Sequence, residues 1–282
     1  MPGTLYICAT PIGNLGDMTP RAVAAMQAAN VILAEDTRVT RKLCTHFGIE
    51  TPLERFDEAS SPRRIPEVLA RLEASEVVAL VSDAGTPLIS DPGYQLVAAA
   101  QDLGLRIECV PGPSALTGAL SVSGLPTDAF YFGGFIPRKA GERRALFTSL
   151  ATLPATLVFY ESPHRLVASL EALAQRFPTR EGAVVRELTK VHEEVVRRAL
   201  PALAAEFADR ESVRGEVVLL VGPPADAERP EPPTEAQVES ALSARLAAGE
   251  SASRAARAVA VEMGLPKAQV YEVATRLAAR GR

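Results

Sequence analysis

The chain has 282 residues but no tryptophan, only three cysteines and only three histidines. Cys8, Cys44 and Cys109 lie far apart in apolar surroundings, so we expect buried small side chains and neither a disulfide set nor zinc ligands. Because the histidines are scattered as well, we expect no metal site built by the protein. Alanine, valine and leucine dominate what remains, which predicts an aliphatic core.

Long apolar runs and an excess of positive charge are also missing. No run approaches the roughly 20 residues that a membrane span requires, and Met1 leads straight into the strand-like segment 4–8, which leaves no room for a signal peptide. We therefore expect a cytoplasmic protein without a membrane partner. The formal net charge of −4 gives no overall attraction to nucleic acid, so any such binding must come from local patches.

Strands alternate with helices in residues 1–122. Apolar runs predict strands at 5–9, 31–34 and 77–81, and we expect a further strand at 106–110. Helical spacing and capping signals predict helices at 21–29, 41–47, 62–74 and 115–122, with another beginning near residue 96. This alternation predicts an N-terminal α/β domain whose mostly parallel sheet is covered on both faces.

A second α/β domain is predicted at 123–222, because a new strand begins at 130–135 after a hinge-like stretch at 123–127. Its strands are short and unevenly spaced, so we expect a mixed sheet. Five prolines between residues 223 and 233 predict an exposed, semi-rigid linker.

Residues 234–282 carry no strand signal and predict a small all-α module of three helices. The last two helices have the pattern of a helix-turn-helix, with Val270 and Tyr271 on the second of them. Seven arginines and lysines against five glutamates give this segment a net charge of +2. Because the whole chain carries −4, the other 233 residues carry −6. Both nucleic-acid contact and simple packing are open for this module.

Small polar loops follow four strands of the first domain, at 10–13, 35–38, 82–94 and 111–114. In a parallel sheet these strand ends share one rim, where α/β proteins bind ligands. No loop has the dinucleotide fingerprint or a P-loop, and small residues outnumber basic ones, so we expect a ligand gripped by backbone groups. Within the longest loop we expect Asp91–Gly93 to begin the next helix rather than to contact substrate.

Seven motifs occur in an order and at a spacing that resemble a known family. They are Ala9–Asp17, Glu35–Arg38, Ser82–Tyr94, Val110–Ala115, Gly134–Pro137, Phe159–Arg165 and Arg186–Lys190. With them the chain resembles the tetrapyrrole methylase superfamily and, within it, the ribosomal RNA small subunit methyltransferase I family. The resemblance covers about residues 4–222 and implies two α/β domains with a cleft between them, followed by the helical module.

The resemblance also implies an activity. It implies a methyltransferase that uses S-adenosylmethionine, works as a homodimer, and methylates the ribose 2′-oxygen of a cytidine of 16S ribosomal RNA near the decoding centre. The cofactor-binding residues that it implies are Ile12, Gly13, Asp83, Gly85, Thr86, Ser114, Ala115, Leu188 and Gly215. The superfamily's tetrapyrrole enzymes often have Gly-Asp-Pro where this chain has Ser82-Asp83-Ala84. We interpret this difference as a feature of the subfamily, and the aspartate is kept.

Methyl transfer to a ribose hydroxyl needs positioning, together with a base or a cation that stabilises the alkoxide. Asp36 and Lys190 are our candidate catalytic residues, with Glu161, Glu187 and His192 as further candidates on the cleft side. Asp36 with Arg38 could instead form a helix cap and a salt bridge. A lysine is a base only if its pKa is lowered by burial or by neighbouring charge.

Local basic segments are the candidate RNA contacts of this otherwise acidic chain. The residues that we predict to contact RNA are Arg38, Arg41, Arg138, Lys139, Arg143 and Arg144. A solvated basic face is the usual explanation of such runs, and it is their placement near the predicted rim that favours phosphate contact.

Two rival functions remain open at this point. One is a methylase of the same superfamily that acts on a tetrapyrrole or another small molecule, although the basic segment and the helical module favour RNA. The other is a DNA-binding regulator that uses the terminal helix-turn-helix, for which a net charge of +2 is a small electrostatic footprint.

Overall fold

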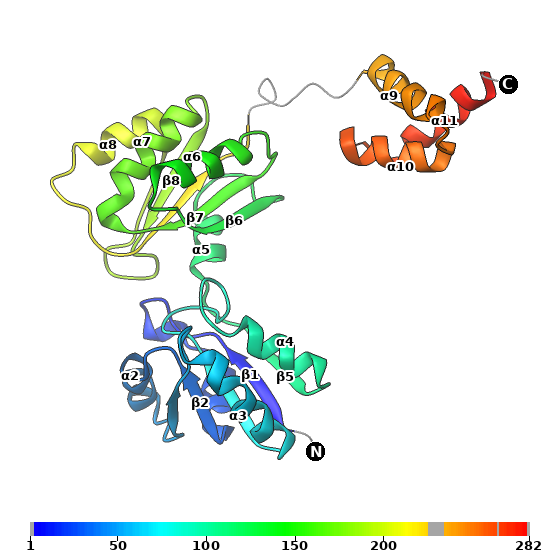
Figure 1. The fold of residues 1–282 in the computed structure, drawn as a ribbon. Coiled ribbons are helices and arrows are strands. Elements are labelled where there is room, and N and C mark those ends of the chain that lie inside the picture. Colours follow the sequence, from blue (N-terminus) through cyan, green and yellow to red (C-terminus); the bar gives the residue numbers. More distant parts are fainter. Residues whose placement is uncertain (1–2, 225–233, 264, 281–282) are drawn as a thin grey trace. The chain divides into compact units, whose positions relative to one another are not determined.

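Two five-stranded sheets organise the larger part of the chain in the computed structural model, which describes residues 3–224, 234–263 and 265–280 (Figure 1). The chain divides into two compact units, Met1–Glu228 and Arg229–Arg282. Both sheets belong to the first unit, and three helices form the second. The mixed α/β fold class with a helical C-terminal module is therefore confirmed.

The first sheet is parallel throughout. Its strands are β1 (Thr4–Cys8), β2 (Val31–Ala34), β3 (Leu53–Arg55), β4 (Val77–Val81) and β5 (Arg106–Val110), in the order β3-β2-β4-β1-β5. Its helices are α1 (Pro20–Ala28), α2 (Thr37–Phe47), α3 (Ser61–Glu73) and α4 (Tyr94–Asp102), with a short 3-10 helix at Leu15–Asp17. Side chains alternate across β1, so that Cys8 packs with Met26 of α1 on one face and Leu5 packs with Leu72 of α3 on the other. Both faces are covered, as the alternation of strands and helices predicts.

The second sheet is mixed, as predicted. Its strands are β6 (Phe130–Phe135), β7 (Thr156–Glu161), β8 (Glu181–Arg186), β9 (Glu194–Ala199) and β10 (Val217–Val221), in the order β6-β7-β10-β8-β9. Only β6 and β7 pair in parallel, and the other neighbours are antiparallel. The remaining helices of this unit are α5 (Ala115–Val122), α6 (Ala140–Ser149), α7 (Leu166–Arg176) and α8 (Leu200–Ala208), with a 3-10 helix at Pro163–Arg165.

Helix α5 packs on the second sheet although it follows the last strand of the first. Its residues Ala119 and Leu120 are buried against Val158, Val185 and Val218. The boundary that we predict at 122/123 thus falls after a helix whose apolar face is covered by the second sheet, and it stays a prediction. Helices α6, α7 and α8 contribute to the core on the opposite face of this sheet.

The second unit has its own small apolar core. Its helices are α9 (Glu235–Ala247), α10 (Ala252–Met263) and α11 (Lys267–Arg280). Val270 and Tyr271 both lie on α11, the second helix of the predicted helix-turn-helix, where Val270 is fully buried in this core and Tyr271 is exposed. Most of the predicted linker, residues 225–233, lies outside the described residues.

Two further expectations need correction or completion. Cys109 is exposed, unlike Cys8 and Cys44, because it lies on the edge strand β5. Strand β3 has no counterpart in our predictions. Within the described residues, no helix has the length and apolar character needed to cross a membrane, and no group of three or more potential ligands could hold a metal ion.

Candidate active site

The loop after β4 holds the other three loops of the rim. Its Gly85 exchanges two backbone hydrogen bonds with Thr10 of the first loop, at 2.9 and 3.0 Å. The side chain of Asp83 accepts a hydrogen bond of 3.0 Å from the backbone N–H of Asp36 in the second loop. The hydroxyl of Thr86 donates to the carbonyl oxygen of Pro113 in the fourth, at 3.1 Å. The four loops therefore share one rim, as a parallel sheet requires.

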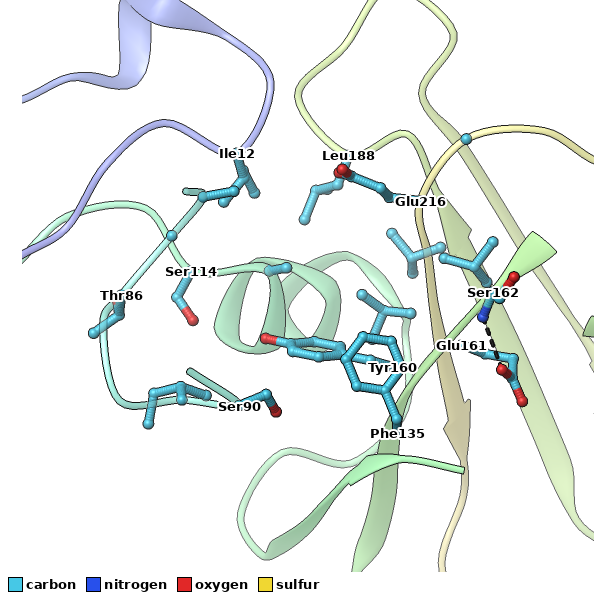
Figure 2. A pocket seen from close by; sticks show the side chains of 18 of the residues that line it. Ile12, Thr86, Ser90, Ser114, Phe135, Tyr160, Glu161, Ser162, Leu188 and Glu216 are labelled. Atoms are coloured by element: carbon cyan, nitrogen blue, oxygen red, sulfur yellow. Dashed lines mark hydrogen bonds between the residues drawn. The ribbon is translucent and has the colours of Figure 1, made fainter. Parts of the chain in front are cut away.

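A cavity of about 350 Å³ opens between this rim and the second sheet, and we call it the central cavity. Figure 2 shows Ile12, Thr86 and Ser114 on one side of it and Leu188 and Glu216 on the other. Seven of the nine predicted cofactor-binding residues line it, namely Ile12, Gly85, Thr86, Ser114, Ala115, Leu188 and Gly215. The structure thus brings together, in one cavity, residues that lie up to about 200 positions apart in the sequence.

The other two predicted residues, Gly13 and Asp83, line a neighbouring cavity of about 340 Å³ that shares Ile12 with the first. Lys190 also lines it, so we call it the Lys190 cavity. Gly13 has a φ of +143°, and a Cβ atom there would lie 2.4 Å from Cε of Lys190. Glycine at this position therefore lets the lysine side chain cross over the first loop.

The lysine itself is held as a cation. Its Nζ donates to Glu187 Oε1 at 2.8 Å and to Glu216 Oε2 at 3.0 Å. Burial alone lowers the pKa of Lys190, but the hydrogen bonds and charges of Glu187 and Glu216 outweigh it and raise the pKa. Lys190 therefore lacks the lowered pKa that a catalytic base would need, and it offers a fixed positive charge.

Asp36 forms the cap and the salt bridge that its sequence context allows. It is the N-cap of α2, where it accepts a 2.9 Å hydrogen bond from the backbone N–H of Arg38, and it pairs with the Arg38 guanidinium at 2.6 Å. These bonds hold the pKa of Asp36 well below its usual range. A carboxylate of such low basicity is a poor proton acceptor at neutral pH.

Glu161 supports the wall of the central cavity rather than its chemistry. Its side chain is buried and accepts hydrogen bonds of 2.8 Å from Arg165 Nε and from the backbone N–H of Ser162, and another from the Ser169 hydroxyl. Arg165 also donates to the carbonyl oxygen of Ile136 at 2.7 Å. This network fixes Ser162 at the cavity, as Figure 2 shows for its bond to Glu161.

Two aromatic residues of the second sheet complete the central cavity, and neither is among our predicted site residues. Tyr160 and Phe135 meet edge to face with ring centroids 5.6 Å apart. Phe135 remains 60% exposed, whereas burial raises the pKa of Tyr160. The signal available in the sequence was the pair of motifs that contain them, at 134–137 and 159–165.

Strained backbone flanks the central cavity on both sides. Leu88 and Ser90 on the first side, and Glu187 and Thr189 on the second, have φ between +52° and +76°. Among the described residues only one other non-glycine residue, Ser75, has a positive φ. Left-handed backbone costs a non-glycine residue about 1–3 kcal/mol and tends to gather at functional sites.

The predicted RNA-contacting residues lie on the surface of two helices. Arg38 and Arg41 are exposed on α2, whose residues Thr40 and Lys42 line the Lys190 cavity. Around the start of α6, Arg138, Lys139 and Arg144 are exposed and Arg143 is half-buried. Lys139 forms an ion pair of 3.0 Å with Glu142, so one charge of this segment is partly compensated.

Comparison with known proteins agrees with this geometry. The family model described as Tetrapyrrole (Corrin/Porphyrin) Methylases matches residues 4–204, which includes both sheets except β10. The chain belongs to the tetrapyrrole methylase family. Its recognition from seven motifs is therefore confirmed, and it is a methyltransferase whose cofactor is S-adenosylmethionine.

Curated relatives match most of the length of the chain. "Ribosomal RNA small subunit methyltransferase I" of Synechocystis sp. is 44% identical over 281 residues, which cover 99% of this chain and 100% of the relative. The protein of the same name from Mesorhizobium japonicum is 45% identical over 90% of this chain and 86% of its own. The Xylella fastidiosa protein of that name is 51% identical over 80% of this chain and 83% of its own.

Solved structures share the fold. Uroporphyrin-III-C-methyltransferase from Thermus thermophilus superposes with a TM-score of 0.53 at 22% identity, covering 79% of this chain and 93% of the other. A diphthine synthase superposes with a TM-score of 0.60 at 13% identity, covering 78% and 90%. At these identities the likeness shows the fold alone.

The residues of the central cavity suit the cofactor. Its volume lies within the range of about 300–1,000 Å³ that is typical of small-molecule sites. Ile12, Leu188 and Val217 offer apolar surface, and the hydroxyls of Thr86 and Ser114 offer hydrogen bonds. A Cβ atom on Gly85, where φ is +85°, would approach Cγ2 of Ile12 to 3.3 Å and narrow this wall. The cavity thus fits a ligand with a flat apolar part and several polar groups.

Proposed function

We propose that this methyltransferase acts on 16S ribosomal RNA and methylates the ribose 2′-oxygen of a cytidine near the decoding centre. The observation that supports it most is the cavity that gathers residues of both sheets and adjoins the Lys190 cavity, which Lys42 of α2 lines and near which Arg38 and Arg41 of the same helix are exposed. Relatives that share up to 99% of the chain's length are named for small-subunit ribosomal RNA. Since that RNA is assembled into ribosomes in the cytoplasm, we place the protein there.

In this proposal the central cavity holds the cofactor and the Lys190 cavity lies beside the reacting hydroxyl. Bound S-adenosylmethionine supplies a methyl group on a positively charged sulfur, which is reactive toward an oxygen nucleophile. The loops fixed by Gly85, Asp83 and Thr86 position both partners and exclude water. Lys190 presents a positive charge toward the oxygen as negative charge develops on it.

Asp36 has a supporting role in the same proposal. It caps α2 and pairs with the Arg38 guanidinium, which stays exposed to solvent, where a phosphate can contact it. We propose that Arg38, Arg41, Arg138, Lys139, Arg143 and Arg144 contact the RNA backbone. Such contacts would hold the RNA without reading its sequence.

A homodimer is part of the proposal. Strand β6 is an edge of the second sheet and exposes Phe130, Tyr131 and Phe135. An exposed apolar edge favours association, and a second copy of the chain is the partner that we propose. Sedimentation of the intact protein and of Phe130→Ser tests it, with the wild type expected as a dimer and the variant shifted toward monomer.

The decisive experiment is the transfer of labelled methyl groups from S-adenosylmethionine. Small ribosomal subunits that lack the modification are compared with free ribosomal RNA and with DNA. We expect label on the ribose of a single cytidine of 16S RNA, recovered as an alkali-resistant dinucleotide. Label on no RNA, or on DNA instead, contradicts the proposal.

A further inference from the structure

A third cavity, of about 600 Å³, adjoins the central cavity, and we call it the Tyr94 cavity. The two cavities share Ser90 and Asp91 in their walls. The other walls come from Glu35 after β2, Phe56 after β3 and Tyr94 at the start of α4. A ligand in the Tyr94 cavity would therefore lie directly beside whatever occupies the central cavity.

The wall between the two cavities is an unusual piece of backbone. Leu88 and Ser90 both have left-handed backbone there, with φ of +76° and +68°. Gly93 closes the same turn with φ of +126°, where a Cβ atom would lie 2.8 Å from Leu80. A loop that keeps such conformations is shaped by its surroundings, and here its two faces border two cavities.

The Tyr94 cavity has an aromatic surface at its mouth. Tyr94 lines the cavity while 75% of the residue is exposed, whereas Phe56 is fully buried behind it. Proteins that read single-stranded RNA stack splayed bases on exposed aromatic rings of this kind. A planar base is thus a ligand that this cavity can accept.

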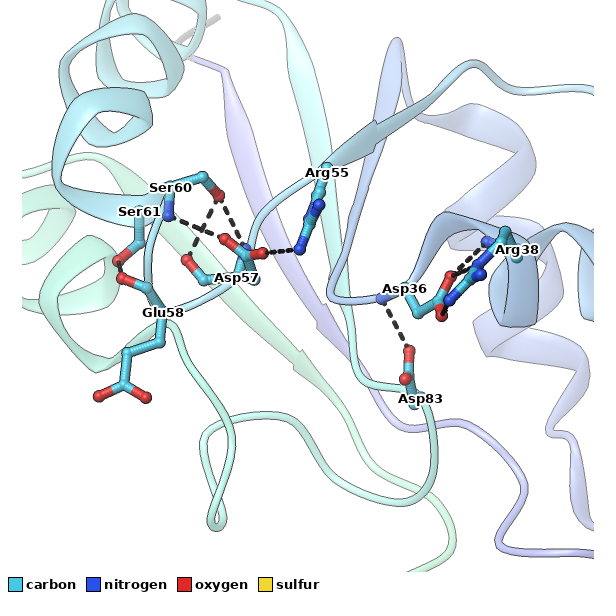
Figure 3. A network of polar contacts seen from close by, with 8 residues as sticks. All are labelled: Asp36, Arg38, Arg55, Asp57, Glu58, Ser60, Ser61 and Asp83. Atoms are coloured by element: carbon cyan, nitrogen blue, oxygen red, sulfur yellow. Dashed lines mark hydrogen bonds and ion pairs between the residues drawn. The ribbon is translucent and has the colours of Figure 1, made fainter.

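The charges of the cavity decide which part of a nucleotide can enter. Glu35, Glu58 and Asp91 line it, and carboxylates repel phosphate groups. Figure 3 shows that Asp57 nearby is held by Ser60 and Arg55, and that Asp36 is held by Arg38, whereas the Glu58 side chain lies outside these contacts. The phosphates must therefore stay outside, and the base edge is what these carboxylates can bind.

Carboxylates also discriminate between bases. Cytosine presents an exocyclic amine where uracil presents a carbonyl oxygen, and glutamate or aspartate accepts hydrogen bonds from that amine. Burial and the charge of Glu35 raise the pKa of Asp91 to about 6, so near pH 7.5 its carboxylate is ionised and only accepts hydrogen bonds. A hydrogen bond from Ser82 lowers the pKa of Asp91 and the charge of Asp83 raises it, and burial and the charge of Asp91 in turn raise the pKa of Tyr160.

We propose that the Tyr94 cavity binds the base of the acceptor nucleotide, cytosine, with Glu35 and Asp91 accepting hydrogen bonds from its exocyclic amine and Tyr94 stacking on its ring. The ribose of that nucleotide then extends from the shared wall across the central cavity, with its 2′-hydroxyl toward the Lys190 cavity that adjoins it. This inference rests on the proposed function, from which the cytidine acceptor comes. It adds the residues that select the base.

The test measures nucleoside binding rather than methyl transfer. The full-length protein is saturated with S-adenosylhomocysteine and titrated with cytidine, uridine and adenosine, with binding followed by NMR. We expect cytidine to bind at least about tenfold more tightly than uridine, within the range of a good base contact. Glu35→Gln should reduce this ratio to about three or less, because an amide can donate to the uracil oxygen. Asp91→Asn should also reduce the cytidine-to-uridine ratio, and it is the replacement variant if Glu35→Gln does not fold.

The matched control is Glu73→Gln, an exposed glutamate at the end of α3 that lines none of the three cavities. It should leave the cytidine-to-uridine ratio and the affinity for S-adenosylhomocysteine unchanged. Tyr94→Ala should weaken cytidine and uridine alike by about tenfold, because stacking does not depend on the base. A ratio that stays the same in both Glu35→Gln and Asp91→Asn overturns the inference, and so does uridine that binds the wild-type protein as tightly as cytidine.

Methyl transfer by the wild-type protein separates this inference from the proposed function. If label reaches a cytidine of small subunits but the carboxylate variants keep the nucleoside ratio, only the base-binding role fails. If no RNA is labelled while cytidine is still preferred over uridine, the proposed substrate fails and the cavity's selectivity stands.

Discussion

The carboxylate of Asp91 destabilises the folded protein at neutral pH, because its pKa is raised from 3.8 to about 6 by burial and by Glu35. Between about pH 4 and pH 6 the folded state binds more protons than the unfolded state, so stability falls as the pH rises through this range. Asp91→Asn should therefore stabilise the protein by about 1 kcal/mol at pH 7.5, a figure reduced for solvent screening at a half-buried site. Thermal unfolding at pH 7.5 and pH 4 measures it, and an equal gain at both pH values would contradict the prediction.

A second prediction at this scale concerns Lys190. If its fixed charge is what matters, Lys190→Arg should keep part of the methyl-transfer rate, and Lys190→Met should lose about 100-fold, the usual effect of removing one charge-stabilising group. The rate is measured in single turnover, and the affinity for S-adenosylhomocysteine serves as the control. Equal losses in the two variants would leave the lysine with a packing role over Gly13.

Some residues of the site were predictable from the sequence and others were not. The cofactor-binding set came from motifs, and seven of its nine members line one cavity. Asp91 was expected only to begin a helix, yet α4 begins at Tyr94 and Asp91 lines two cavities. The left-handed conformations of Leu88 and Ser90 follow from tertiary contacts, and no local pattern predicts them.

At the scale of elements, long periodic or apolar segments were predictable and short ones were not. Strands β2, β4 and β5 agree with the predicted bounds, since β2 and β4 are runs of apolar residues and β5 lies between turn signals at Gly104 and Pro111. Strand β3 is not predictable from the sequence, because Leu53–Arg55 spans three residues and none of them is fully buried. Its place at the sheet edge comes from pairing with β2, which is a long-range contact.

The loop after β4 offers a prediction with a close control. Gly85 and Gly104 both have positive φ, at +85° and +67°, so alanine at either should cost about 1–2 kcal/mol of stability. Only Gly85 lines the central cavity, where its Cβ would meet Ile12, whereas no atom lies within 4 Å of a Cβ on Gly104. Calorimetry should show weaker S-adenosylhomocysteine binding for Gly85→Ala alone. A similar loss in Gly104→Ala would point to general destabilisation.

The basic segment at the start of α6 should act on RNA alone. Replacing Arg138, Lys139, Arg143 and Arg144 by glutamine should weaken binding to 16S RNA and reduce the slope of log K against log salt by about 3, since each phosphate contact contributes about 0.7. S-adenosylhomocysteine affinity should not change, because none of the four lines the central cavity. The control is the double variant Arg106→Gln with Arg176→Gln, whose residues lie on other elements. Equal RNA binding by the wild type, the four-residue variant and this control would contradict the prediction.

For the molecule as a whole, the division into two units predicts separable contributions. Residues Met1–Glu228 contain both sheets and their cores, so a chain that ends there should keep its S-adenosylhomocysteine affinity and its unfolding temperature. In the helical unit Arg245 and Arg276 are engaged in ion pairs with glutamates, whereas Arg254 and Arg257 are exposed on α10. With so small a net charge, removal of this unit should weaken binding to 16S RNA less than neutralising the α6 segment does. Binding isotherms of the two variants at the same salt concentration decide the order, and a larger loss on truncation would make the helical unit the main RNA-binding part.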